Sequence, residues 1–410
     1  MCFPFYTVFK KYKIIGPVNN ISMIHVAKYE KAKLQSNFAL KFGELPMMIL
    51  LKNVECFCPE YKGFNDILVT GEKIFKIQPD ICIKDGFAEK IYDCSGFYAF
   101  PGIIDQHLHI TGGGGEEGFG SNIPEIEIKE IFRAGITTAV GLLGADGHTK
   151  NLEGLYTKAK ALEGAGISTF MYTGSYTLPT QTITGSIIRD MIFIDKVIGV
   201  KTAISDHRSS HPEIHELIKI ASQAHLGGML ANKAGVVHIH VGDGKKGLAP
   251  LTGVFTDSDL PKKMFVPTHL NRNKKLFKQA KEYCKSGGNI DLTAGEPDGI
   301  PVPEAVEELL KDNIPLDSVT VSSDSNGSIP NGGIGSTMSL YQDIISCITS
   351  KKIHPSTAFR LVTENAAKVL RLYPKKGVLR QGSDADILIT DKNYNIKMLI
   401  CNGRIVFEEK

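Results

Sequence analysis

The chain has 410 residues, and 42% of them are hydrophobic, which is enough for a large buried core and for one to three domains. Its 47 basic and 44 acidic residues give a net charge of +3, a balance that argues against a nucleic-acid or membrane partner. Eight scattered cysteines without a CxxC pair, and no apolar run of about 18 residues, exclude a disulfide scaffold and a membrane span and predict a reducing, cytoplasmic compartment.

The first 45 residues differ from the rest of the chain in composition. They are rich in lysine, contain no arginine and have only Glu30 and Glu44 as acids. No basic stretch precedes their apolar part and no clean cleavage site follows, so we expect no secretory signal. We interpret residues 1–45 as an N-terminal extension and assign them no role.

Short alternating strands with turn signals follow this extension and return at the end of the chain. Residues 49–100 and 377–408 share this pattern and lack helical periodicity between their turns. We therefore expect residues 46–100 and 374–410 to pair into one small β-sandwich domain.

The middle of the chain, residues 101–373, alternates apolar strands with amphipathic helices. This alternation indicates parallel βαβ units, and eight strands of nearly continuous apolar character predict a (β/α)8 TIM-like barrel. A doubly wound open sheet is the alternative, but the chain has neither a GxGxxG loop nor a Walker motif to favour it. The predicted strands are 99–106, 137–143, 168–174, 197–205, 236–241, 263–270, 289–294 and 319–324.

Helical patterns lie between these strands, and several of them end in glycine, as helix C-termini often do. A further helix over 354–374 is expected to connect the barrel to the last β-segment. The other predicted helices include 124–135, 151–166, 211–225, 273–288 and 303–313.

Polar residues stand at or near the exits of five of the predicted strands, where barrel enzymes carry their chemistry. Each has a structural alternative: a lone histidine is more often a hydrogen-bonded structural residue than a ligand, a strand lysine usually extends to water, and an aspartate commonly caps the next helix. Together, however, they would be costly to bury unless something paired them. The residues are His107, His109, Lys201, His240, His269 and Asp324.

This set of donors predicts a metal site. Neutral imidazoles and a carboxylate suit zinc, with manganese, iron or nickel as alternatives. Two metals close together would need a bridging anion, and a lysine kept neutral by burial, Lys201, could react with carbon dioxide to supply one as a carbamate.

The chain resembles a known superfamily and, more specifically, one family within it. The superfamily is that of the binuclear metal-dependent amidohydrolases, and the resemblance covers roughly residues 49–408. It is carried by the order of the candidate ligands: HLH, the apolar-flanked Lys201, and then the later histidines and aspartate. Within this superfamily the chain is similar to the isoaspartyl (β-aspartyl) dipeptidase family. Seven strings of the sequence carry this narrower resemblance: IDQHLHITGGGGEEG, VGLLG, YTGSYTLPTQTITGS, VIGVKTAISDHRSS, HVGDGKKGL, PTHLNRN and SSDSNGS.

The resemblance implies two zinc ions per subunit, bridged by N6-carboxylated Lys201 and a hydroxide. His107 and His109 would bind the more buried ion, which Asp324 completes. His240 and His269 would bind the other ion.

The resemblance also implies the substrate contacts. Glu116 would hold a free α-amino group, Tyr176 would polarise the scissile carbonyl, and Asp324 would move the proton. The remaining implied substrate-binding residues are Gly114, Gly115, Arg208, Arg272 and Ser328. Without the resemblance, a solvated loop acid, a rim aromatic and helix-capping or surface-paired arginines would be the simpler interpretations.

The function predicted from this resemblance is hydrolysis of the β-linked amide bond of β-aspartyl dipeptides. One position departs from the family: Ala145 stands after VGLLG, where the family typically has a threonine, so one substrate hydrogen bond is in doubt. The alternatives are a cyclic-amide amidohydrolase, similar to dihydroorotase or hydantoinase, and a non-catalytic scaffold of the same fold. The resemblance further predicts a homo-oligomer, with an octamer as the specific expectation, and a small dipeptide substrate as the binding partner.

Overall fold

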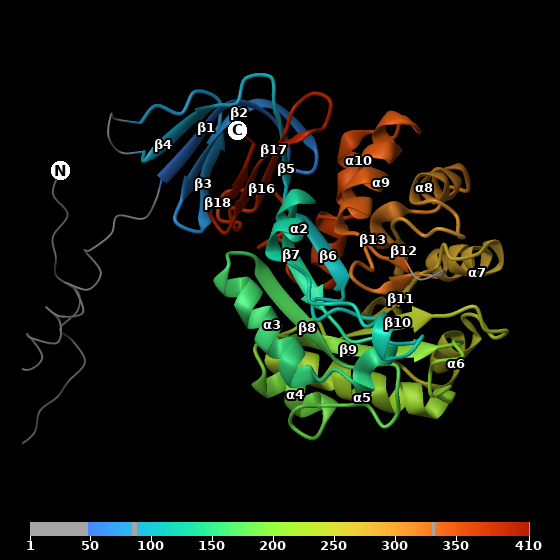
Figure 1. The fold of residues 1–410 in the computed structure, drawn as a ribbon. Helices are drawn as coiled ribbons and strands as arrows, with labels where there is room; N and C mark the ends of the chain where they lie inside the picture. The colour runs from blue at the N-terminus through green and yellow to red at the C-terminus, as the bar shows by residue number, and fades with distance from the viewer. Residues whose placement is uncertain (1–47, 84–87, 330–332, 410) are drawn as a thin grey trace, which may run out of the picture. The chain divides into compact units, whose positions relative to one another are not determined.

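The computed structural model describes residues 48–83, 88–329 and 333–409. The interpretation of residues 1–45 falls outside these described residues and stays a prediction. Figure 1 shows two kinds of architecture in the remainder: strands flanked by helices in the middle of the chain, and a sheet built from both chain ends.

Parallel strands in sequential order form the central sheet. Of the strands that the structure describes, six pair side by side from β6 to β11, and each pair is parallel. This order never reverses, which excludes the doubly wound alternative, because such a sheet reverses its order at a switch point. The strands are β6 (Ile103–Leu108), β7 (Ile136–Gly141), β8 (Ser168–Gly174), β9 (Val197–Ile204), β10 (Val236–Val241), β11 (Phe265–Thr268), β12 (Ile290–Thr293) and β13 (Val319–Ser322).

The last two strands join this sheet through side chains. β12 and β13 pair with each other as a separate parallel ladder. The buried carboxylate of Asp291 on β12 accepts hydrogen bonds of 2.7 Å from Thr268 on β11, Gln106 on β6 and Thr320 on β13. One side chain therefore ties four strands together where the backbone ladder is interrupted, which gives the parallel sheet its barrel-type closure.

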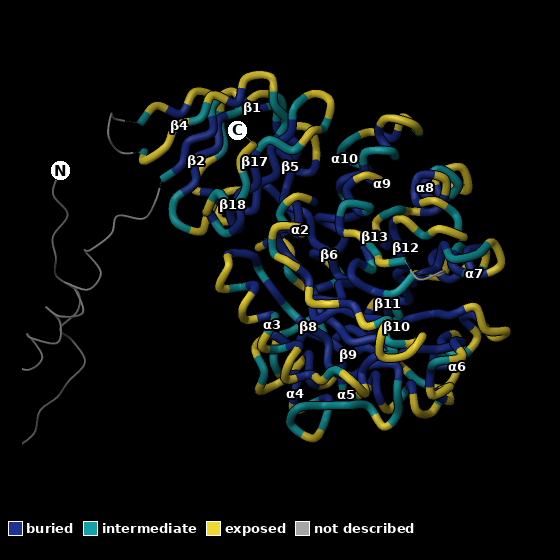
Figure 2. The backbone as a smooth tube through the Cα atoms, viewed as in Figure 1, coloured by how far each residue is buried: buried dark blue, intermediate teal, exposed yellow. Residues whose placement is uncertain are grey.

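Helices cover the outer side of these strands (Figure 1), and the strands themselves form the buried interior in Figure 2. Asn151 and Asn273 begin two of the helices by accepting backbone N–H bonds of 2.8 Å, as N-cap residues do. Among the described residues, no helix is both long enough and apolar enough to cross a membrane. The helices are α2 (Ile128–Arg133), α3 (Leu152–Gly164), α4 (Ile187–Phe193), α5 (Ile214–Ala231), α6 (Ala249–Asp257), α7 (Lys274–Lys285), α8 (Val302–Lys311), α9 (Thr337–Thr349), α10 (Pro355–Arg360) and α11 (Glu364–Val369).

Both chain ends share one hydrogen-bonded sheet, as expected from their common pattern. Its order is β18-β17-β16-β5-β1-β2-β3, with β4 paired to β1. Side chains from the N-terminal and C-terminal strands pack into a core of their own that includes Ile49, Ile67 and Ile387. The strands are β1 (Met48–Phe57), β2 (Tyr61–Thr70), β3 (Lys73–Gln78), β4 (Lys90–Asp93), β5 (Tyr98–Pro101), β16 (Ile387–Thr390), β17 (Ile396–Cys401) and β18 (Arg404–Glu408), and a hairpin of β14 (Ser328–Ile329) and β15 (Gly333–Ile334) stands apart from them.

The expected single helix over 354–374 is wrong, because the chain forms two short helices, α10 and α11, there. Between them Thr363 leaves helical geometry, with φ −129° and ψ −89°. The break turns the Val362 carbonyl toward β6, where it accepts the N–H of Ile104 at 2.8 Å. Tertiary hydrogen bonding to the barrel strands thus replaces helical hydrogen bonds that local propensity favours.

Candidate active site

The predicted strand-end residues meet at one end of the barrel. His107 lies within β6, Lys201 within β9 and His240 within β10, while His269 directly follows β11. Carboxyl ends of parallel strands converge at one face of a barrel, so residues far apart in the chain become neighbours.

A cluster of imidazoles surrounds Asp324. One carboxylate oxygen, Oδ1, lies 3.1 Å from His107 Nε2 and 3.2 Å from His109 Nε2. The other oxygen lies 3.8 Å from His269 Nδ1. The His269 ring is 4.6 Å from that of His240, measured between centroids, which brings all four predicted histidines into one group. We call these five residues and Lys201 the inner cluster.

Lys201 is fully enclosed in this cluster. Its Nζ is 3.4 Å from His107 Nε2. Burial lowers the pKa of Lys201 to about 7, because a charged ammonium loses its hydration there. Its amine is therefore largely neutral above about pH 7, and the neutral amine is the state that carbamate formation requires.

The donor atoms of the inner cluster fit a divalent metal. Burial lowers the pKa of His107 to about 3 and the pKa of His269 well below its usual value, so both imidazoles are neutral and carry lone pairs. Ligand atoms of His107, His269 and Asp324 lie within 4.8 Å of one another. Nε2 of His269 is buried and has no hydrogen-bond partner among the described residues. An unpartnered buried nitrogen beside a carboxylate is the arrangement expected of a metal ligand.

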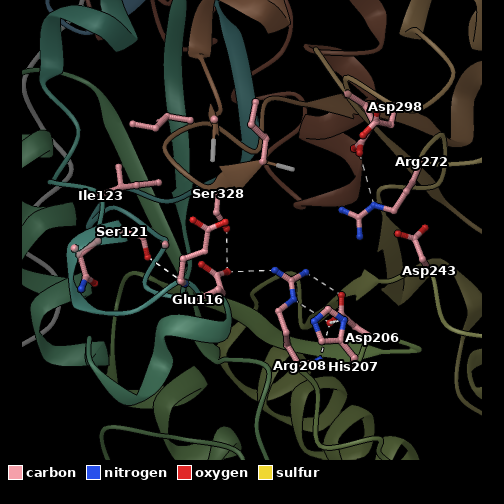
Figure 3. Close-up of a pocket in the computed structure, with 18 of the residues that line it drawn as sticks. Glu116, Ser121, Ile123, Asp206, His207, Arg208, Asp243, Arg272, Asp298 and Ser328 are labelled. Atoms are coloured by element: carbon pink, nitrogen blue, oxygen red, sulfur yellow. Dashed lines mark hydrogen bonds and ion pairs between the residues drawn. The ribbon is translucent and has the colours of Figure 1, made fainter. Parts of the chain in front are cut away.

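Four predicted substrate residues with polar side chains, Glu116, Arg208, Arg272 and Ser328, line a cavity of about 790 Å³, which Gly114 lines as well. The same four side chains also line a second, smaller cavity together with His109, His240 and Asp324 of the inner cluster. Figure 3 shows the side chains of Glu116, Arg208 and Ser328 pointing toward one another from separate segments of the chain. Glu116 Oε1 accepts from Arg208 at 3.2 Å and from the Ser328 hydroxyl at 2.9 Å. We call these four residues the clamp. It presents one carboxylate and two guanidinium groups to the cavity.

Arg272, the second guanidinium of the clamp, has an acidic neighbour that sequence reasoning missed. Its Nε lies 3.7 Å from Glu296 Oε1. Burial raises the pKa of Glu296, against the opposing effect of Arg272. The charge of Arg272 is thus only loosely compensated and remains available to an anion in the cavity.

Tyr176 is buried between the clamp and the inner cluster. Its hydroxyl contacts His240 Nδ1, and the Arg208 guanidinium lies 5.6 Å from the centre of its ring. Burial raises the pKa of Tyr176 well above its usual value, so the hydroxyl stays protonated and can donate a hydrogen bond.

The glycine run permits a backbone path that other residues would obstruct. Gly112 and Gly114 have φ of 76° and 80°. A Cβ on Gly114 would lie 2.3 Å from the Ser121 carbonyl. Gly114 lines both cavities and Ala145 lines only the smaller one, whereas Gly115, predicted beside Gly114, lines neither of these two cavities among the described residues.

Three further buried polar residues were missed by sequence reasoning. His238 Nε2 lies 2.9 Å from His107 Nδ1, and Asp206 Oδ2 lies 2.7 Å from His240 Nε2. Asp291 closes the barrel beneath them. A signal existed for His238, because it stands two positions before His240 in VVHIHV and therefore shares its strand face. Asp206 stands in the SDHR string, in which the resemblance implied a role for the arginine, Arg208, alone.

Comparison with known proteins places this geometry among amidohydrolases. The amidohydrolase family model matches residues 262–406. Two solved structures of the β-aspartyl dipeptidase from Fervidobacterium islandicum AW-1 share 40% and 41% sequence identity with the chain, each with a TM-score of 0.84. Each alignment covers 88% of this chain and 97% of that protein, and the second structure is a complex with β-Asp-Leu dipeptide.

Other similarities are more distant. A D-hydantoinase structure has a TM-score of 0.64 at 16% identity, which shows a shared fold alone. An adenine deaminase from Kosmotoga olearia is 25% identical over 385 residues, or 89% of this chain. The chain spans 59% of that deaminase, and its match to a dihydroorotase from Anaplasma phagocytophilum spans 25% of that enzyme.

Proposed function

The chain belongs to the β-aspartyl dipeptidase family of amidohydrolases, and from this premise we propose that it hydrolyses the β-linked amide bond of isoaspartyl dipeptides. The observation that carries the proposal is the clamp: a carboxylate and two guanidinium groups line the same small cavity as His109, His240 and Asp324 of the inner cluster. An isoaspartyl dipeptide carries the complementary charges, one α-ammonium and two carboxylates.

We propose that the inner cluster holds two zinc ions. His107, His109 and Asp324 would hold one ion, and His240 and His269 would hold the other, with Lys201 bridging them as a carbamate. Such ions supply Lewis-acid chemistry, since they lower the pKa of a bound water toward about 7 and polarise an amide carbonyl. The neutral histidines and the lowered pKa of Lys201 support this assignment.

The chain's own residues would carry the proton and the charge. Asp324 accepts a proton from the attacking water and then delivers it to the leaving amine, as a general base followed by a general acid. Its position among imidazoles keeps this carboxylate ionised and thus able to accept a proton: although burial alone would raise the pKa of Asp324, hydrogen bonds with His107 and His109 help to hold it well below its usual value. Tyr176 donates a hydrogen bond to the developing oxyanion, a contribution of about 3 kcal/mol for a preorganised donor.

The clamp would orient the substrate by charge. Glu116 binds the α-ammonium group, while Arg208 and Arg272 bind the two carboxylates, and Ser328 with the backbone of Gly114 adds hydrogen bonds. A β-linkage displaces the scissile carbonyl by one methylene, so an α-linked dipeptide held by the same charges would misplace its carbonyl relative to Asp324 and Tyr176.

A cyclic-amide activity is the weaker alternative. Dihydroorotate and hydantoins lack the ammonium group that would pair with Glu116. When such a substrate bound, the Glu116 carboxylate would therefore be buried without a substrate cation to neutralise it. A non-catalytic scaffold is weaker still, because every predicted ligand of the inner cluster is present.

A substrate panel with metal analysis on the same sample tests the proposal. We expect turnover of β-Asp-Leu, negligible turnover of α-Asp-Leu, dihydroorotate and hydantoin, and about two metal ions per chain. Turnover of a cyclic amide with none of β-Asp-Leu would contradict the proposal. Less than one ion per chain without activity would favour the scaffold.

We also propose a cytoplasmic homo-oligomer. The seven described cysteines are free, in keeping with a reducing compartment. The division into a barrel over 101–373 and a β-sandwich domain over 46–100 and 374–410 stays a proposal too, which the shared core of the two chain ends supports.

A further inference from the structure

Asp206 joins the two parts of the active site through a single carboxylate. Its Oδ2 lies 2.7 Å from Nε2 of His240, in the inner cluster, and 2.9 Å from a terminal nitrogen of Arg208, in the clamp. Its Oδ1 accepts from the Arg208 backbone N–H at 2.8 Å and from the Arg208 Nε at 3.0 Å. The Asp206 side chain is only 4% exposed, so its carboxylate is largely shielded from water.

The turn that carries Asp206 is held rigidly. Ser205, directly before it, has φ of 53°, and its hydroxyl donates to the Gly247 carbonyl at 2.7 Å. A Cβ on Gly242 would lie 2.6 Å from Asp206 Cβ, and one on Gly244 would lie 2.4 Å from the Ser205 carbonyl. The glycines of the HVGDGKKG string therefore let β10 and the Asp206 turn pack backbone against backbone, which places the carboxylate next to His240.

The contact with Asp206 determines which nitrogen of His240 carries the proton. A carboxylate only accepts hydrogen bonds, so His240 must donate from Nε2. In the neutral ring Nδ1 then keeps the lone pair, and here it receives the Tyr176 hydroxyl. Nδ1 is thus the nitrogen that remains available as a ligand atom.

The same carboxylate determines which edge of Arg208 can meet a substrate. Asp206 occupies the Nε edge of the guanidinium, so a bidentate contact with substrate is possible only through the two terminal nitrogens. One of these terminal nitrogens also donates to Glu116 at 3.2 Å, and Glu116 accepts from Ser328 at 2.9 Å. A continuous series of polar contacts therefore runs from His240 to the far side of the clamp.

We infer that Asp206 is a positioning residue that orients the metal ligand His240 and the substrate clamp Arg208 at the same time. The inference rests on the proposed function in taking His240 as a metal ligand and Arg208 as a substrate contact. It predicts that one substitution changes metal retention and substrate affinity together. Outer-shell partners of metal-binding histidines typically change metal affinity by about 10- to 100-fold when removed.

The test compares Asp206→Asn with Asp66→Asn in the full-length protein. Asp66 is a matched control: it is 2% exposed and accepts two backbone N–H bonds of 2.8 Å, but it lies in the sheet of the chain ends. For Asp206→Asn we expect zinc affinity of one of the two ions to fall by about 10- to 100-fold, and KM for β-Asp-Leu to rise by about 10-fold, the effect of weakening one charged hydrogen bond. Asp66→Asn should lower the melting temperature while zinc affinity and KM stay unchanged.

Wild-type zinc affinity and a KM within twofold in a folded Asp206→Asn protein would overturn the inference. If that variant does not fold, the inference can be tested in the zinc-loaded wild-type protein, where selective ¹⁵N-histidine labelling shows which nitrogen of His240 carries the proton. The His240 signal, assigned with His240→Gln, should report a protonated Nε2, and a protonated Nδ1 would contradict the inference. Failure of the proposed function looks different, since wild-type protein would then leave β-Asp-Leu uncleaved whatever stands at position 206.

Discussion

The inner cluster and the clamp differ in how the cost of burying polar groups is kept low: by neutral side chains in the inner cluster and by ion pairing in the clamp. Inner-cluster residues lie on strands or directly beyond them, and burial keeps their bases neutral, as the pKa values of Lys201 and His107 show. The charged clamp residues, Glu116, Arg208 and Arg272, lie between strands, and two of them neutralise one another: the side chains of Arg208 and Glu116 are 27% and 28% exposed and form an ion pair. The strands thus position the reactive groups, and the segments between the strands position the charges that would recognise the substrate.

This difference suggests how substrate can enter the clamp. A partly exposed ion pair contributes little to stability, so its partners can exchange at low cost. A substrate ammonium can take the place of Arg208 beside Glu116, while a substrate carboxylate takes the place of Glu116 beside Arg208. Inner-cluster residues have no such freedom, and changes there should be far more damaging.

The largest expected effect is that of Lys201→Ala. Removing the bridging group should lower kcat/KM by more than about 1,000-fold, since both metals and the reaction geometry depend on it, and should reduce metal content per chain. Lys196→Ala is the matched control, because Lys196 is 5% exposed and precedes the same strand at its opposite end. It should lose stability but retain metal. Full activity of Lys201→Ala without added short carboxylic acids would refute the carbamate role.

A pH effect on stability should come next. In metal-free protein, Lys201 is neutral when folded above pH 7 because its folded pKa is about 7, but the unfolded chain binds a proton up to about pH 10.5. The free energy of unfolding should therefore rise with pH between these values, by about 1.4 kcal/mol per pH unit from this residue. Below pH 7 both states bind the proton and the slope vanishes.

Urea unfolding at pH 7.0, 8.0 and 9.0 would measure this slope in wild-type protein and in Lys201→Met. The difference between the two proteins isolates the lysine, because all other titrating groups are shared. Equal slopes would show that Lys201 is not desolvated in the folded protein, and would remove the contrast between a neutral inner cluster and a charged clamp.

A smaller effect is expected from Glu116→Gln, which keeps the shape of the side chain but removes its charge. Loss of a charge-assisted hydrogen bond to the α-ammonium should lower kcat/KM for β-Asp-Leu by about 10- to 100-fold, mainly through KM, with metal content unchanged. Glu117→Gln is the neighbouring control and should change kcat/KM by less than about twofold. Equal effects of the two substitutions would mean that Glu116 is not the amine anchor.

The smallest effect should follow Ala145→Thr, which introduces the hydroxyl that the family typically has. Ala145 and Asp146 line the smaller cavity, which His109, His240 and Asp324 also line. One added neutral hydrogen bond should lower KM by about 2- to 10-fold. Ala145→Val has nearly the same shape without the hydroxyl, so an equal decrease in both variants would attribute the change to packing rather than to hydrogen bonding.

Local pattern was sufficient for most of the strands. All eight predicted barrel strands are present, because nearly continuous apolar runs bounded by glycines and helical segments leave few other structures possible. The first run, residues 99–106, divides at Gly102 into β5, which pairs with β1 and β16, and β6, which pairs with β7. Gly102 also allows a close approach to the next strand, because a Cβ there would lie 2.3 Å from the Thr137 side chain. Such a close approach between chain segments has no signature in a periodicity.

The sequence by itself determined the order and type of the reactive groups: two histidines two residues apart, an apolar-flanked lysine, two further histidines and an aspartate, each at a strand. Convergence at one barrel end then follows from parallel topology. Tertiary structure alone decided that Asp291 closes the barrel, that Tyr176 contacts His240, and that Asp206 covers one edge of Arg208. These outcomes depend on distances and angles between side chains from separate segments, and folding, not local pattern, determines those distances.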